Sequence, residues 1–172
     1  MNNFNNGNSR DNLELDTTID NSNVYNNELI GCISIYHILK HSHTLSPAKA
    51  MLILPLVCHN GILSYLNRAN TDVKSIEQLL IRKPELLSNF NERFYSLLNT
   101  SINSILMLNA MNFISIKEEL IYLIDKEKEF VPVKEPKIIG KRAYKIIEAS
   151  STVSRLLDDK IENLYLQLRV KL

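Results

Sequence analysis

Three histidines near the end of the first apolar segment come closest to a metal site in this sequence. His37 and His41 lie one helical turn apart, so both imidazoles could bind one Zn²⁺, and His43 follows at once. A structural zinc site needs four ligands, yet the spacing of Cys58 and His59 does not predict that they join the histidines. We therefore expect no metal, and we interpret the histidines as favourable positive groups at a helix C-terminus.

The residues that could support catalysis form no recognisable constellation. A serine or cysteine nucleophile needs a base and an orienting acid, but the chain has no GxSxG motif, and Cys32 and Cys58 both lie in apolar segments. The four scattered glycines cannot make a P-loop or a GxGxxG turn. Neighbouring carboxylates such as Glu118 and Glu119 point apart on a helix. The sequence predicts a protein that is not an enzyme and binds no cofactor.

One cluster of basic residues stands out near the C-terminal third of the chain. Five cations surround a single acid, Glu135, where a linker enters a helix. Such a cluster can contact phosphates, although a solvated face or an acidic protein partner is the more ordinary explanation. The candidate nucleic-acid-binding residues are Lys134, Lys137, Lys141, Arg142 and Lys145.

Length and composition indicate one domain of moderate size with appendages. The 172 residues are 45% hydrophobic, enough for one core, and the formal net charge of +1 argues against a binder that uses overall positive charge. The N-terminus lacks the apolar region of a signal peptide, and the longest apolar run, Ala50 to Cys58, is far shorter than the roughly 20 residues that a membrane span needs. We expect a cytoplasmic protein with reduced cysteines and no membrane partner.

Helical spacing of apolar residues begins at Tyr25 and ends near Lys40. Ser46 followed by Pro47 predicts a second, nearly all-apolar helix that reaches Val57 and is kinked or interrupted at Pro55, and Asn60 and Gly61 break the chain before Ile62. Ser75 with Gln78 resembles a capping box and predicts a short helix. From Glu85 the three/four spacing continues past Ile105, which predicts one long helix or two helices joined near Thr100.

The next segment predicts a small β-hairpin. Residues 113–117 alternate, Lys117, Glu118 and Glu119 suit a turn, and Leu120 to Ile124 are compatible with a second strand, although a helical alternative for 117–125 stays open. Helices followed by a hairpin are typical of a winged helix. The predicted fold class is therefore mainly α, with a winged-helix-like body and a C-terminal helical segment.

The chain divides into four predicted parts. Residues 1–23 form a disordered Asn-rich tail, 24–125 the winged-helix-like body, 126–137 a charged linker with two prolines, and 138–172 the C-terminal helical segment, in which Asp159 and Glu162 suggest a helix restart. The tail could also order on a partner. The C-terminal apolar face supplies the candidate partner-binding residues, Ile161, Leu164, Tyr165 and Leu168.

A family resemblance adds to this interpretation. LILPLVCH (Leu52 to His59), after a Ser-Pro helix start, resembles an "LPLVLH"-like helix in the middle component of three-component ABC systems. The long stretch from Ser75 to Leu108, the strand-like FISI (Phe113 to Ile116) and the closing NLYLQLRV (Asn163 to Val170) follow in the family's order, although Cys58 before His59 and the Asn-rich leader depart from its pattern. The resemblance covers nearly everything from Tyr25 to Leu172.

The resemblance implies a function that the residues alone do not. It implies a winged-helix-like accessory subunit that acts with an SMC/Rad50-like ABC ATPase and an effector, often a nuclease, as in Lamassu-type defence against phages and plasmids. DNA would be contacted, if at all, through the complex. The alternative is a stand-alone winged-helix transcription regulator, which should present basic residues on its recognition helix; between Glu85 and Ile116 only Arg93 is basic, which disfavours that alternative.

Overall fold

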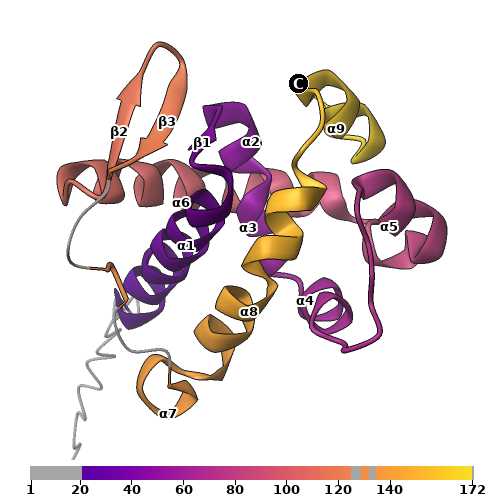
Figure 1. Ribbon diagram of the computed structural model, residues 1–172, viewed down its shortest axis with the longest axis horizontal. Helices are drawn as coiled ribbons and strands as arrows, with labels where there is room; N and C mark the ends of the chain where they lie inside the picture. The colour runs from indigo at the N-terminus through magenta and orange to yellow at the C-terminus, as the bar shows by residue number, and fades with distance from the viewer. Residues whose placement is uncertain (1–20, 125–128, 132–134, 172) are drawn as a thin grey trace, which may run out of the picture.

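The computed structural model describes residues 21–124, 129–131 and 135–171, with residues 21–26 described by their backbone. Helix α1 (Asn21–Ser42) lies at the centre, between α6 (Phe90–Ala110) and α8 (Lys141–Leu156) (Figure 1). Every residue from Gly31 to Leu39 is buried, which explains the broad apolar pattern of this helix. The helix begins inside the range predicted as a tail, and residues 1–20 lie outside the described residues.

The predicted second helix is present but is interrupted one turn earlier than Pro55. It is divided into α2 (Pro47–Met51) and α3 (Ile53–Val57), and the Ser46 hydroxyl accepts the predicted capping bond from the Lys49 N–H at 3.3 Å. A proline has no N–H to donate to the carbonyl four residues earlier and its ring crowds that carbonyl. For Pro55 that carbonyl belongs to Met51, so the helix breaks there.

The predicted break at Asn60 and Gly61 also lies earlier, at Cys58 and His59. Helix α4 (Asn60–Leu66) already contains Asn60 and Gly61 in its first turn. By length and composition no single described helix could cross a membrane, whereas one bent pair of segments, Pro47–Val57 with Asn60–Leu66 at 93°, passes that test.

The next predicted helix is confirmed, and the long helix after it is confirmed as one piece that begins at Phe90, later than the predicted Glu85. Helix α5 (Ile76–Arg82) starts at Ser75, whose hydroxyl accepts a hydrogen bond from the Gln78 N–H at 3.2 Å. A short 3₁₀ turn, η1 (Pro84–Leu86), then leads to α6, which is one continuous helix through Thr100. The predicted spacing of three and four residues therefore describes a single buried face along α6.

The predicted hairpin is present, and a third strand completes a small antiparallel sheet. Strands β2 (Ile114–Lys117) and β3 (Leu120–Leu123) are joined by Glu118 and Glu119, whose φ angles of 48° and 63° allow a tight two-residue turn. Strand β1 (Thr44–Leu45), which the sequence did not reveal, pairs with β3 and gives the order β1-β3-β2. The mainly helical fold class is thus confirmed, and this sheet is compatible with the winged-helix prediction.

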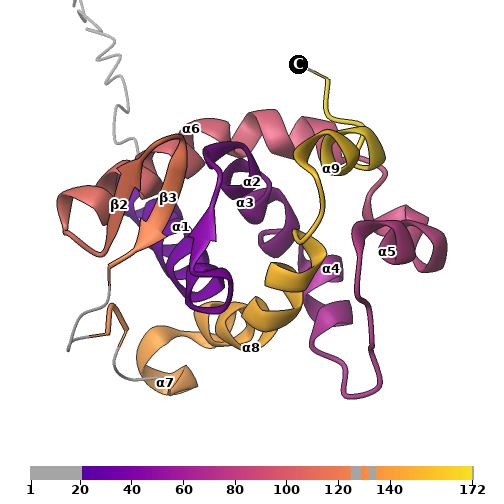
Figure 2. The same ribbon diagram turned by 45° about the horizontal axis from the view of Figure 1, so that its top comes forward.

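The C-terminal segment shares the core of the body. After α7 (Pro136–Ile139), α8 packs on α1, and α9 (Ile161–Gln167) packs beside α5. One hydrophobic cluster includes Ile121 of the sheet, Val153 of α8 and Leu164 of α9. Figure 2 shows the hairpin at one end of α6 and the pair α5 and α9 at the other, so α6 spans the whole body.

Candidate functional surfaces

The predicted basic cluster lies on one exposed surface at the start of α8. Lys137 on α7 and Lys141, Arg142 and Lys145 on α8 are all exposed, whereas Lys134 lies outside the described residues. Within the described residues none of these four cations forms an ion pair. We call Lys137, Lys141, Arg142 and Lys145 the basic surface.

The basic surface is joined to α4 and to the break before it by hydrogen bonds. Lys141, Arg142 and Lys145 line a shallow hollow of about 280 Å³ together with Asn60, Leu63 and Ser64 of α4. The Arg142 guanidinium donates to the Cys58 carbonyl at 2.5 Å, and the Asn67 amide donates to the Lys145 carbonyl at 2.9 Å. The first bond holds the start of α8 on the break before α4, and the second holds the next turn of α8 on the C-terminal end of α4. Lys141 and Lys145, one helical turn apart, are therefore the cations best placed to meet phosphate oxygens.

The structure does not bring the three N-terminal histidines together. His37 is buried, with its ring edge-on to Tyr36 at 5.3 Å, whereas His41 Nε2 lies 3.1 Å from the Ser150 hydroxyl of α8. His43 is exposed, with a φ angle of 61° just after α1. Among the described residues no group of three or more metal-binding side chains is found.

His59 has a structural role that sequence reasoning missed. Its Nδ1 accepts a hydrogen bond from the Ile62 N–H at 3.1 Å and so caps α4. Partial burial, and to a smaller degree the charge of Arg93, lowers the pKa of the imidazole. Histidine is not among the residues preferred at helix N-caps, so the residue type of His59 did not indicate this role. The signal that could have indicated it is the helical pattern of apolar residues that starts directly after His59.

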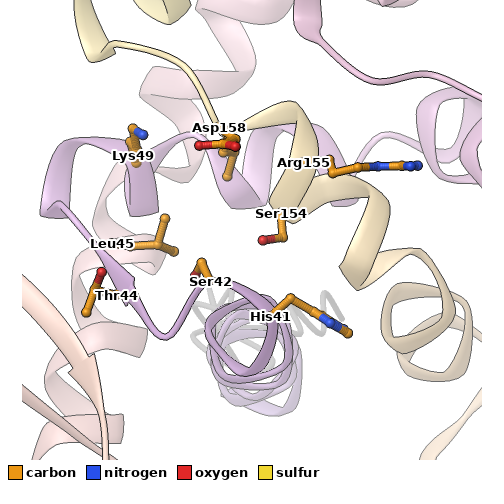
Figure 3. A pocket seen from close by; sticks show the side chains of 9 residues that line it. His41, Ser42, Thr44, Leu45, Lys49, Ser154, Arg155 and Asp158 are labelled. Carbon is orange, nitrogen blue, oxygen red and sulfur yellow. The ribbon is translucent and has the colours of Figure 1, made fainter.

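A polar hollow of about 480 Å³ lies between the ends of α1 and α8 and the start of α2. Figure 3 shows that the side chains of His41 and Arg155 point away from Lys49. Arg155 lies 3.9 Å from Asp72, and His41 contacts Ser150. The charged side chains that line the hollow therefore do not converge on one point, which acid–base chemistry would require.

The predicted partner-binding residues hold α9 on the body of this chain. Leu164 and Leu168 are buried in the main core and Ile161 packs against it. The Tyr165 hydroxyl donates to the Ala48 carbonyl at 3.0 Å, and its ring packs edge-on against Phe94. The apolar face of α9 is thus turned inward and packs on this chain's own core. A role for these four residues in partner binding stays an untested prediction.

Comparison with protein families matches this chain to a known family. A family model described as "ABC-three component (ABC-3C) system Middle Component 3" matches residues 18–172. The match includes every described element, from α1 to α9. No curated protein and no solved structure matches the chain.

Proposed function

The chain belongs to the Middle Component 3 family of ABC three-component systems, and from this membership we propose that it is a non-catalytic accessory subunit of a cytoplasmic defence complex. It docks on an SMC/Rad50-like ABC ATPase and couples that ATPase to an effector, a nuclease in a system of the Lamassu type. The family match over residues 18–172 is the observation on which the proposal depends.

The use of the polar side chains supports a non-catalytic role. Ser46, Ser75 and His59 each accept a backbone N–H at the start of a helix. Arg142 bonds a backbone carbonyl, and so does Arg93, whose guanidinium donates to the carbonyl of Leu86 at 3.0 Å. These groups satisfy the backbone and join helices, so they stabilise the fold and are not held ready for a substrate.

DNA enters this proposal through the basic surface. Its exposed lysines, Lys137, Lys141 and Lys145, can contact phosphates without reading bases, which suits an accessory subunit that holds DNA against the ATPase. The competing function, a stand-alone winged-helix regulator, needs basic residues on the helix before the hairpin. That helix is α6, and its one basic residue is Arg93. The Arg93 guanidinium donates a hydrogen bond to the Leu86 carbonyl and lies over the Phe90 ring at 5.5 Å, so it is already used within the chain.

Co-expression of the chain with the other two components of its ABC system tests the proposal. An affinity tag on this chain should recover the ABC ATPase and the third component in fixed stoichiometry through size-exclusion chromatography. Recovery of this chain alone, as a monomer or as a homodimer that protects a specific DNA sequence, would overturn the proposal and favour the regulator.

A further inference from the structure

The exposed side of α6 is uncharged along its whole length after the first turn. From Phe94 to Ile116 the sequence has no acidic or basic residue and no histidine. Tyr95, Ile102 and Leu106 are 50%, 38% and 55% exposed, and Asn99 lies between them at helical spacing. We call Tyr95, Asn99, Ile102 and Leu106 the α6 face.

The other long surface helix of the chain is built differently. The exposed positions of α8 include Lys141, Lys145, Glu148 and Arg155, so nearly every turn presents a charge to solvent. A helix that stays in water usually has such a face opposite its apolar stripe. The α6 face instead exposes large apolar side chains among asparagines, which is typical of a surface that another protein covers.

A buried carboxylate lies against the same helix. Glu28 of α1 is only 8% exposed, and its Oε1 accepts a hydrogen bond from the amide of Asn103 at 3.3 Å. Its Oε2 has no hydrogen-bond partner among the described residues. Asn103 is exposed and directly follows Ile102 of the α6 face. This unsatisfied carboxylate oxygen is covered in the free chain, so a cation from a partner pairs with it once the side chains over it move aside.

We propose that the α6 face is the docking site for an amphipathic helix from another component of the ABC system. The apolar row of that helix covers Ile102 and Leu106, and one arginine or lysine of it pairs with Glu28. The row from Tyr95 to Leu106 extends about 16 Å, enough for three turns of a partner helix. This inference rests on the proposed function, because it locates the docking that the function requires.

The charge pattern favours this occupant over a second copy of the chain. Two α6 faces packed together would bring the same uncharged side chains against each other, with Lys171 beside each Tyr95, and the covered Glu28 carboxylates would keep an unpaired oxygen. A partner helix with one basic residue satisfies that oxygen and excludes water from the apolar row at the same time.

Binding of purified chain to the complex of the other two components tests the docking site. We expect Leu106→Glu and, separately, Glu28→Gln to raise the dissociation constant about tenfold or more, since each substitution removes a central contact. Ile81→Glu is the matched control: Ile81 is 73% exposed on α5, at the end of the body where α6 begins, and its variant should bind within about twofold of wild type.

Thermal unfolding of each free variant separates docking from folding. Glu28→Gln should leave the free chain at least as stable as wild type, because it replaces a buried, partly unsatisfied charge with a neutral amide. Loss of binding at retained stability supports the proposal. Wild-type binding by Leu106→Glu overturns the docking site and leaves the proposed function intact. If neither wild type nor Ile81→Glu binds the other two components, the proposed function itself is refuted. If the chain forms a homodimer that Leu106→Glu dissociates, the α6 face binds a second copy and the proposal of a different partner is refuted.

Discussion

At the scale of single residues, His59 shows how a group that suggests metal chemistry can serve the backbone. Its Nδ1 is an acceptor only while the imidazole is neutral, and burial lowers its pKa accordingly. A histidine whose pKa is lower in the folded state than in the unfolded state stabilises the fold above the unfolded value and loses that contribution as the pH falls.

We therefore predict that His59 makes the stability of this chain sensitive to mild acid. Urea unfolding should show a larger loss of stability from pH 7.5 to pH 5.5 for wild type than for His59→Asn, which keeps a capping acceptor that does not titrate. His59→Ala should cost about 1 kcal/mol at pH 7.5 through loss of the cap. An equal pH dependence in wild type and His59→Asn would contradict the role of the imidazole.

The two cysteines also serve packing. Burial raises the pKa of the Cys32 thiol to about 11, so the thiol stays protonated at neutral pH, and its Sγ lies 3.5 Å from the Ser104 carbonyl. Burial raises the pKa of the Cys58 thiol as well, with Arg142 acting in the opposite direction. Both thiols are unbridged, and neither has the lowered pKa of a reactive nucleophile.

At the scale of the elements, the close crossing of α1 and α6 depends on a glycine. A Cβ on Gly31 would lie 2.0 Å from the Ser104 hydroxyl oxygen and 2.9 Å from the Ser104 Cβ. Ser104 itself donates to the Thr100 carbonyl at 2.7 Å. The two helices can therefore approach this closely only because position 31 has no side chain, although glycine weakens a helix interior.

We predict that Gly31→Ala destabilises the chain by about 1–3 kcal/mol, because the strain of overpacking exceeds the gain in helix propensity. Ser104→Ala in the same chain should restore part of that loss, since it removes the nearer of the two contacts. Chemical denaturation of the single and double variants measures both effects. An unchanged or higher midpoint for Gly31→Ala alone would show that the helices can separate without cost.

Each of the two helix breaks between α1 and α4 is caused by a residue within about one helical turn of it. The predicted interruption at Pro55 appears at Leu52, because the proline removes the bond to Met51. The second break lies before Asn60, because the His59 side chain can cap the helix there. The sequence thus predicted an interrupted helix followed by a further helix, as observed, but placed both breaks a few residues too late.

At the scale of the whole molecule, two different surfaces face outward. The basic surface lies at the start of α8, and the uncharged α6 face lies along a helix on the other side of α1 (Figure 1). One surface suits phosphates and the other an apolar helix. An accessory subunit with both could contact DNA and another component at once.

We predict that the double variant Lys141→Glu with Lys145→Glu weakens DNA binding of the assembled complex. The plot of log binding constant against log salt concentration should become shallower, with the magnitude of its negative slope reduced by about 2. Arg142 is left in place because it bonds the Cys58 carbonyl. Lys74→Glu with Lys83→Glu changes the net charge equally near α5, where Lys74 is exposed and Lys83 is half-buried, and should leave the slope unchanged. Fluorescence anisotropy at several salt concentrations measures the slopes. Equal slopes for both double variants would assign the basic surface to another role.

What the sequence determined by itself was local. The helix starts at Ser46 and Ser75 depend on residues within about four positions of each other, so spacing and residue type were sufficient there. The same local signals left open one helix or two near Thr100 and a turn or a helix at Glu118 and Glu119, and the structure decided both. The order of short motifs also indicated the family, which the match over residues 18–172 confirms.

What only the tertiary structure decided depends on residues far apart in the chain. Strand β1 exists because Thr44 and Leu45 pair with Tyr122 and Ile121. An apolar row looks the same in sequence whether its own chain or another protein covers it: that of α9 is turned inward, whereas Ile102 and Leu106 stay exposed beside the buried Glu28. The physical reason is that burial depends on how distant helices meet, and periodicity along one helix contains no information about its neighbours.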